Sequence, residues 1–162
     1  MAIGFGKHNH ARCIKDALAV AEDRCAAQKL QFTKIRRRVL EILLAGHKTM
    51  GAYEILDELA ADGHKAQPPV AYRALEFLVT NGFAHKVEKR NAYIACSFPQ
   101  NAHTPAFLIC RACDEVVETC LNMGDTPPRG LLGGAALALG FQVETAVLEA
   151  SGLCPGCQEA QT

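Results

Sequence analysis

Two short cysteine pairs constrain this 162-residue chain more than any other feature of its sequence: Cys110 with Cys113, and Cys154 with Cys157. Two C-x-x-C pairs supply the four thiolates that a tetrahedral zinc site requires. Disulfides or a thioredoxin-like redox motif are the alternatives. A redox pair lies at the strand-to-helix turn of a βαβ unit, whereas both pairs here follow short apolar runs typical of strands. The sequence therefore favours structural zinc.

The composition fits a globular protein that needs no disulfides. Hydrophobic residues make up 49% of the chain, no apolar run approaches the length of a membrane span, and residues 1–10 lack the apolar core of a signal peptide. We therefore expect a cytoplasmic protein, in which eight cysteines indicate metal binding rather than disulfides.

The net charge of zero hides a difference between the two parts of the chain. Residues 1–96 contain fifteen Lys and Arg against ten Asp and Glu, while residues 97–162 contain two against seven. The first part therefore suits a polyanionic partner and the second does not. Solvated faces that happen to differ in charge would give the same numbers.

Helical periodicity dominates the first eighty residues. Amphipathic helices are predicted over 8–27, from the N-cap Thr33 to Gly46, over 52–61 with Tyr53 facing the core, and from Pro69 to a stop at 81–82. The pattern then alternates over 83–88 and 91–96, which indicates a hairpin with Lys89 and Arg90 at its tip. This order is typical of a winged helix, whose last helix enters the DNA major groove.

The remainder of the chain reads as a second small domain. Residues 97–105 contain two prolines and polar residues, as a hinge linker does. Beyond them we predict strands at 106–110 and 115–118, a helix within 127–139 and a strand at 141–150. The predicted fold class is α+β: a winged-helix DNA-binding domain over 1–96, the hinge, and a small α/β domain over 106–162 with the structural zinc.

Several segments together resemble the ferric uptake regulator family, and within it the zinc uptake regulator branch. They cover nearly the whole chain: Leu30-Gln31-Phe32-Thr33 with Arg36, Pro68-Pro69-Val70-Ala71-Tyr72-Arg73-Ala74-Leu75, Gly82-Phe83-Ala84-His85-Lys86-Val87-Glu88, Tyr93-Ile94-Ala95-Cys96, Ala102-His103-Thr104 and both cysteine pairs. The resemblance implies a homodimer that represses metal-uptake genes by binding palindromic operator DNA when loaded with metal.

The resemblance also implies two zinc ions per protomer. By matched position the structural zinc is held by Cys110, Cys113, Cys154 and Cys157, and a sensory zinc at the hinge by His85, Cys96, His103 and Glu118. One thiolate, two imidazoles and one carboxylate suit zinc, while iron and manganese sites usually lack thiolate. Each sensory ligand taken alone has an ordinary alternative role, as a strand histidine, a core cysteine, a loop histidine and a surface carboxylate.

The same alignment of motifs suggests how DNA is contacted. We expect Tyr72 and Arg73 to contact the operator, and Arg37, Arg38, Lys89 and Arg90 to contact phosphates. Tyr72 lies near the edge of its helix's apolar face, so a core position is the alternative.

Some positions depart from the family pattern. The recognition helix usually begins with a hydroxyl residue two positions before the tyrosine, but here Val70 stands there, which removes an N-cap and a polar DNA contact. Thr145 replaces a histidine of a further metal site, which we expect to be absent. Cys120, His8 and His10 are possible additional ligands.

Two other functions are considered. A zinc deaminase needs an H-x-E motif and a P-C-x-x-C motif, and neither occurs; four cysteines would also leave no position on zinc for a water molecule. We therefore expect no enzyme. An iron- or peroxide-sensing regulator of the same family is the closer alternative.

Overall fold

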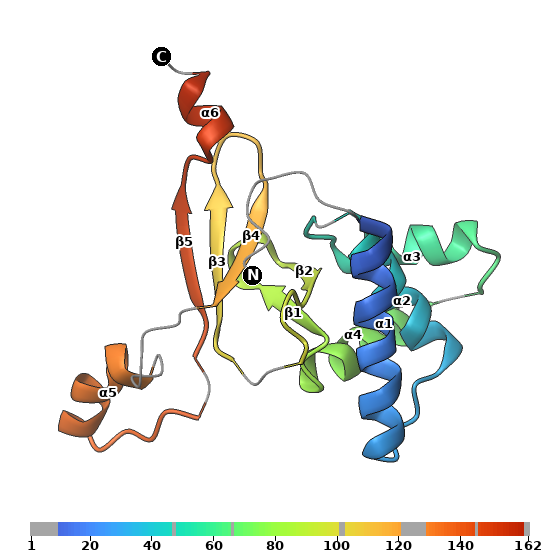
Figure 1. The fold of residues 1–162 in the computed structure, drawn as a ribbon, viewed down its shortest axis with the longest axis horizontal. Helices are drawn as coiled ribbons and strands as arrows, with labels where there is room; N and C mark the ends of the chain where they lie inside the picture. The colour runs from blue at the N-terminus through green and yellow to red at the C-terminus, as the bar shows by residue number, and fades with distance from the viewer. Residues whose placement is uncertain are drawn as a thin grey trace. The chain divides into compact units, whose positions relative to one another are not determined.

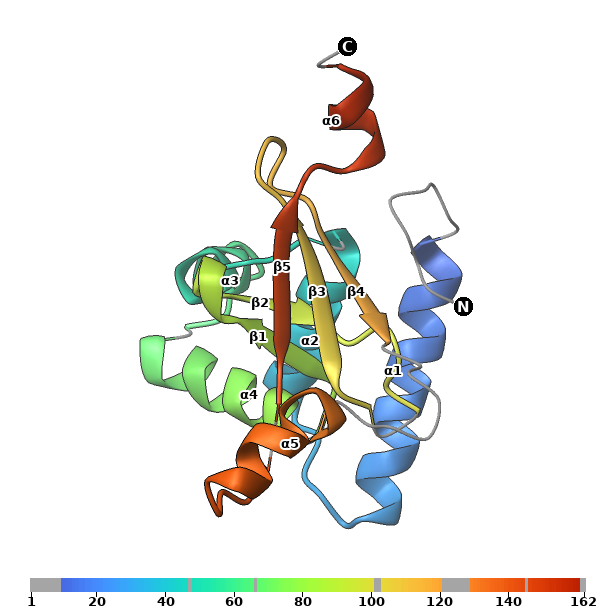
Figure 2. The same cartoon turned by 90° about the vertical axis from the view of Figure 1, so that its left-hand side faces the viewer.

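The computed structural model describes residues 10–46, 48–65, 67–100, 103–120, 129–144 and 146–160, with the backbone alone at 10–13, 120 and 129–131. These residues form two compact units, one within Gly6–Asn101 and the other within Ala102–Thr162. Figures 1 and 2 show the elements of each unit. Among the residues described, no helix combines the length and the hydrophobicity that crossing a membrane requires.

The N-terminal unit contains four helices followed by a two-stranded hairpin (Figure 1). In chain order these are α1 (His10–Ala27), α2 (Lys34–Gly46), α3 (Ala52–Ala61), α4 (Pro68–Thr80), β1 (Ala84–Val87), the short 3-10 helix η1 (Glu88–Arg90) and β2 (Ala92–Ala95). This is the helix order and the hairpin position expected of a winged helix.

Local signals at the helix ends explain where α2 and α3 begin. The Thr33 Oγ1 accepts a hydrogen bond from the Arg36 N–H at 3.4 Å, as the predicted N-cap should. The Gly51 N–H donates to the Glu54 carboxylate at 2.6 Å, which satisfies one of the free amides before α3.

The inward prediction for Tyr53 is wrong, because this side chain is 70% exposed. The buried residues of α3 are Ala52, Ile55, Leu56 and Leu59. They follow the helical spacing of three and four residues, and Tyr53 falls beside that stripe.

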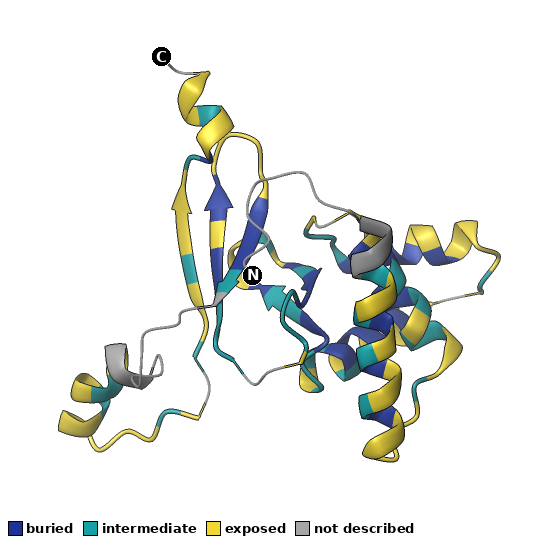
Figure 3. Ribbon diagram, viewed as in Figure 1, coloured by how far each residue is buried: buried dark blue, intermediate teal, exposed yellow. Residues whose placement is uncertain are grey.

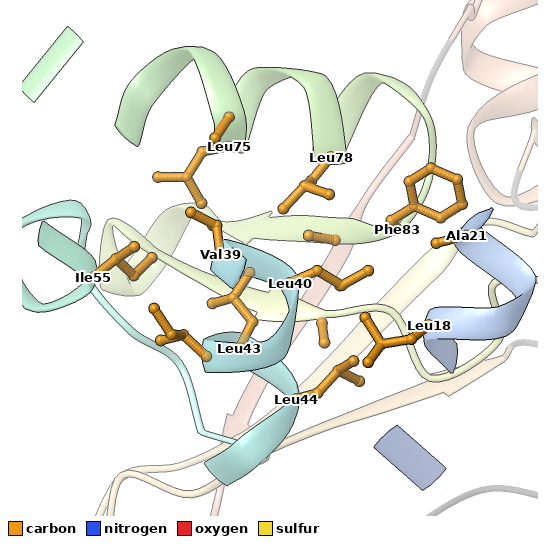
Figure 4. Close-up of a cluster of buried hydrophobic side chains, with 14 of the residues drawn as sticks. Leu18, Ala21, Val39, Leu40, Leu43, Leu44, Ile55, Leu75, Leu78 and Phe83 are labelled. Carbon is orange, nitrogen blue, oxygen red and sulfur yellow. The ribbon is translucent and has the colours of Figure 1, made fainter. Parts of the chain in front are cut away.

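The core of the N-terminal unit lies between its four helices α1 to α4 and the hairpin (Figures 3 and 4). Leu40 and Leu43 of α2 are buried among side chains that include Leu75 and Leu78 of α4. The outer side of α4 remains exposed at Tyr72, Arg73 and Glu76. Packing one face of α4 in this way leaves its other face available to a partner.

The hairpin pairs β1 with β2 in antiparallel register, with Ala84 opposite Ala95 and His85 opposite Ile94. The chain reverses through η1, and Asn91 has a φ of 46°, a left-handed conformation that asparagine tolerates better than most residues. Lys89 and Arg90 consequently lie at the tip of the wing.

The C-terminal unit is built on a three-stranded sheet in the order β4-β3-β5 (Figure 2). Its elements are β3 (Pro105–Cys110), β4 (Val116–Cys120), α5 (Arg129–Ala138), β5 (Leu148–Gly152) and α6 (Pro155–Glu159). The central strand β3 pairs antiparallel with β4 and parallel with β5.

The start of the last strand differs most from prediction, and one helix of this unit was not predicted. The last strand begins at Leu148 rather than at residue 141, because β5 pairs only along Ala106–Cys110 of β3. The earlier alternating segment remains outside the sheet, and its Phe141 is exposed. The helix α6 has only five residues, too few to show a helical period in the sequence.

Candidate metal centres and nucleic-acid interface

The predicted zinc-binding cysteines converge at one end of the C-terminal sheet. Cys110 ends β3, Cys113 lies in the following turn, Cys154 is the N-cap of α6, and Cys157 lies inside α6. Parallel pairing of β3 with β5 brings the two cysteine pairs together, since Cys110 is in register with Gly152. The four sulfurs lie within 4.8 Å of one another.

The distances between these sulfurs fit a metal better than a disulfide. The Sγ atoms of Cys113 and Cys154 are 3.7 Å apart, far longer than the S–S bond of about 2.0 Å. Two sulfurs bound tetrahedrally to zinc at about 2.3 Å would be about 3.8 Å apart. The donor set and its spacing therefore fit one zinc ion with a closed coordination sphere.

The backbone around this cluster favours negative charge at one sulfur. The Cys154 N–H donates to the Cys110 Sγ at 3.4 Å. Backbone hydrogen bonds from Cys154, Cys113 and Ala112 lower the pKa of the Cys110 thiol to about 6. Hydrogen bonds with the neighbouring cysteines, Cys154 first, raise the pKa of Cys157 to about 12. The cluster thus holds one thiolate readily, and a cation is needed to ionise all four.

Two of the predicted sensory ligands lie together in the N-terminal unit. His85 is on β1, and Cys96 directly follows β2, where its N–H donates to the Phe83 carbonyl at 2.9 Å. Their ligand atoms lie within 4.8 Å of each other. The Phe98 N–H donates to the Cys96 Sγ at 3.4 Å. The hairpin therefore sets the spacing of an imidazole and a thiol.

The other two predicted sensory ligands lie together in the C-terminal unit. Glu118 is on β4, opposite Phe107 of β3, and its side chain is 0% exposed. Its Oε1 is 2.8 Å from the His103 Nε2. A buried carboxylate is costly without a partner, and an imidazole or a cation can compensate it. This pair can therefore hold a proton or a metal ion.

The predicted DNA-contacting residues of α4 are accessible. Tyr72 is 46% exposed and Arg73 is exposed beside it, so the core alternative for Tyr72 is wrong. At the tip of the wing, Lys89 is exposed and Arg90 half-buried.

The basic residues of α2 have carboxylate partners that sequence reasoning missed. Arg38 binds both oxygens of Asp62, at 2.5 and 3.1 Å, and Arg37 pairs with Glu22 of α1. Both arginines also contact Glu41 of their own helix. Only Glu41 shows a helical spacing that sequence could reveal; the others come from distant segments. In this structure Arg37 links α2 to α1, and Arg38 links α2 to the C-terminal end of α3.

Four further predicted or possible sites cannot be placed. The side chains of His8, His10 and Cys120, together with Thr145, lie outside the described residues.

Comparison with known proteins gives a consistent result. The curated zinc uptake regulation protein of Escherichia coli (strain K12) is 37% identical over 148 residues, which is 91% of this chain and 84% of that protein. A solved zinc uptake regulator complexed with zinc and DNA matches at a TM-score of 0.83 and 37% identity, covering 91% of this chain and 97% of that one. The holo form of XcZur matches at 0.78 and 38% identity, covering 88% and 96%. No family model matches the sequence.

Proposed function

Because this chain belongs to the zinc uptake regulator branch of the ferric uptake regulator family, we propose that it is a zinc-responsive repressor that binds operator DNA as a zinc-loaded homodimer and represses zinc-uptake genes. The likeness over 91% of the chain to a curated regulator of zinc uptake carries this conclusion. Operator DNA and free thiols both belong to the cytoplasm, where we expect the protein to act. As a transcription regulator it needs no catalytic site.

We assign two zinc ions to each protomer. The first belongs on Cys110, Cys113, Cys154 and Cys157, where four thiolates complete a tetrahedral sphere and leave no position for a substrate or water. Its task is structural, because it ties the end of β3 to α6 within one unit.

The second, sensory zinc is assigned to His85, Cys96, His103 and Glu118. The spacing of His85 and Cys96 is set by the hairpin, and that of His103 and Glu118 by the C-terminal sheet. One ion bound by all four would couple the orientation of the DNA-binding unit to the availability of zinc. Changing a two-state population from 1:99 to 99:1 requires about 5.5 kcal/mol, which a well-formed zinc site can supply.

The donor set favours zinc over the metals of the sibling regulators. Cys96 offers a soft thiolate that zinc accepts, whereas iron(II) and manganese(II) sites are usually built from nitrogen and oxygen ligands. An iron or peroxide sensor is therefore the second candidate function.

For DNA contact we assign Tyr72 and Arg73 of α4 to the base edges, and Lys89 and Arg90 of the wing to the phosphates. Arg37 and Arg38 also remain assigned to phosphates. A phosphate there would have to compete with Glu22, Glu41 and Asp62, which already pair with these two guanidinium groups.

A gel-shift titration tests this function. Duplexes selected from a random library in the presence of zinc should bind the protein as free zinc rises, and should bind far less with iron(II) or manganese(II). Cys96→Ser and His103→Ala should abolish the zinc dependence and leave one zinc per protomer. Cys25→Ser and His64→Ala are matched controls, since these residues belong to neither predicted ligand set. Operator binding that survives loss of Cys96 and His103 would exclude the sensory site.

A further inference from the structure

The first turn of α4 has almost no capacity to donate hydrogen bonds. Proline has no N–H, so Pro68 and Pro69 remove two of the amides that a helix N-terminus normally presents. The next two amides, of Val70 and Ala71, both donate to the Gln67 carbonyl, at 2.8 and 3.4 Å. No amide of residues 68–71 remains to bind a phosphate, although helix N-termini commonly do so.

The side chains of this turn are apolar as well. Pro68, Pro69 and Val70 are exposed, and Val70 is 37% accessible. A valine in a helix has one strongly preferred χ1 rotamer, so its two methyl groups are held in place before any partner arrives. The start of the helix thus presents a fixed apolar surface next to the exposed Tyr72 and Arg73.

Only one base edge in the major groove offers an apolar group. Thymine carries the C5-methyl, whereas the other three bases present donors and acceptors there. In helix-turn-helix proteins the N-terminal residues of the recognition helix are those that contact base edges. A donor-free, apolar first turn can gain contact energy from thymine but would leave the polar edge groups of other bases without a hydrogen-bond partner.

We propose that Val70 is a specificity-determining residue that reads the methyl group of one thymine in each operator half-site. The proposal rests on the function proposed above, with α4 as the recognition helix. It is separate from the contacts assigned to Tyr72 and Arg73, which can also hydrogen-bond to bases or phosphates. Burying one methyl group changes affinity by about four-fold, and by about fifteen-fold when both half-sites of a palindrome lose it.

Thymine-to-deoxyuridine substitution is the direct test, because it removes one methyl group and no hydrogen-bonding atom. The probe is a palindromic duplex selected from a random library with zinc-loaded wild-type protein. Each thymine is replaced singly, and then together with its symmetry mate, and dissociation constants are measured for wild type and for Val70→Ala. Val70→Thr, which keeps the branched shape, is the conservative variant.

We expect one symmetric pair of thymines at which deoxyuridine weakens wild-type binding about fifteen-fold but leaves Val70→Ala unchanged. Val70→Ala should bind the unmodified duplex about as weakly as wild type binds the substituted one, and Val70→Thr should lie between them. The inference is overturned if every thymine contributes equally to wild type and Val70→Ala. Absence of zinc-dependent binding by the wild type would instead contradict the proposed function itself.

Discussion

At the scale of single residues, the ion pair between Arg38 and Asp62 links α2 to the turn between α3 and α4. Asp62 is the C-cap of α3, and both of its oxygens accept hydrogen bonds from the Arg38 guanidinium. This hydrogen bonding lowers the pKa of Asp62 from its ordinary value of 3.8. It also raises the pKa of Arg38. A carboxylate whose pKa is lower in the folded state stabilises the fold while it is ionised.

The stability contributed by Asp62 should therefore depend on pH in a defined direction. It is fully present above the ordinary carboxyl pKa and is lost as the pH falls through the lower folded value. Asp62→Asn should unfold at lower urea than wild type at pH 6, and this gap should narrow below about pH 4. Asp57→Asn, at an exposed position of α3, is the charge-matched control. A gap that stays constant down to pH 2 would contradict the role of the charge.

At this scale the sequence predicted interactions between residues close together in the chain, and it predicted sites made of residue types with distinctive chemistry, such as cysteine. The two cysteine pairs and the Thr33 N-cap could be identified from the sequence pattern, and the structure brings the four cysteines together. The two sensory histidines were suggested only by the family resemblance. Glu22 and Asp62 could not be identified as partners of Arg37 and Arg38, because they lie far away in the chain. Charge pairs between distant segments leave no periodic signal.

At the scale of elements, the parallel pairing of β3 with β5 brings the four thiols together before any metal is bound. Crowded thiols resist ionising together, since like charges at short distance repel. Three backbone hydrogen bonds lower the pKa of Cys110 to about 6, whereas hydrogen bonds with neighbouring cysteines raise the pKa of Cys113 and Cys157. Zinc binding to four thiolates must therefore release the protons that the thiols still hold.

The number of protons released on zinc binding gives the number of thiols that were still protonated in the metal-free protein. With the sensory site removed by Cys96→Ser and His103→Ala, binding of zinc to the metal-free folded protein should release about three protons at pH 7 and about four at pH 5. Titration in a weak buffer with a pH indicator measures this number. Cys110→Ser should release about three at both pH values. Release of four protons at pH 7 by the parent protein would show that Cys110 is not ionised.

The wing is a second element whose role can be measured separately. Each phosphate contact contributes about 0.9 to the slope of log affinity against log salt concentration. Replacing Lys89 and Arg90 by alanine should thus lower the slope by about 1.8 per protomer, without changing which sequences are preferred. Lys15→Ala of α1 with Lys29→Ala in the turn after α1 removes two exposed charges and should leave the slope unchanged. A shift in sequence preference would indicate base contact by the wing.

Element prediction succeeded where periodic patterns were long and failed at short or unpaired segments. The helix at 52–61 has the predicted bounds, and α2 ends at Gly46 as expected. The segment before Leu148 alternates like a strand, yet β5 pairs with β3 over only five residues, Ala106–Cys110. The alternating pattern of a segment shows that it can form a strand, while the partner strand determines how many of its residues pair.

At the scale of the whole molecule, the distribution of charge assigns different partners to the two parts of the sequence. The excess of basic residues lies in 1–96 and the excess of acidic residues in 97–162. A protein of net charge zero can therefore still be steered to DNA by one part, while the acidic part disfavours contact with phosphates. We expect this difference in charge to favour approach to the duplex by residues 1–96.

The proposed homodimer, reading a palindrome, would also fix the distance between half-sites. Two recognition helices on one face of the duplex require half-site centres about 34 Å apart, or one helical turn. Inserting five base pairs between the half-sites should reduce affinity to the non-specific level, because the second half-site then faces the opposite side. Fluorescence anisotropy with the spaced duplexes measures the loss. Equal affinity for the original and the lengthened operator would indicate that the protomers bind independently.

The parallel pairing of β3 with β5 has a consequence for the newly made chain. Cys154 follows Cys113 by 41 residues. A ribosome that adds roughly 5–20 residues per second therefore needs about 2–8 s to reach the second cysteine pair of the zinc site. The β3–β4 hairpin emerges during that interval, and its two zinc-binding thiols, of Cys110 and Cys113, then lack the other two ligands. A nascent chain in a zinc-poor or oxidising cell would be most vulnerable at this stage.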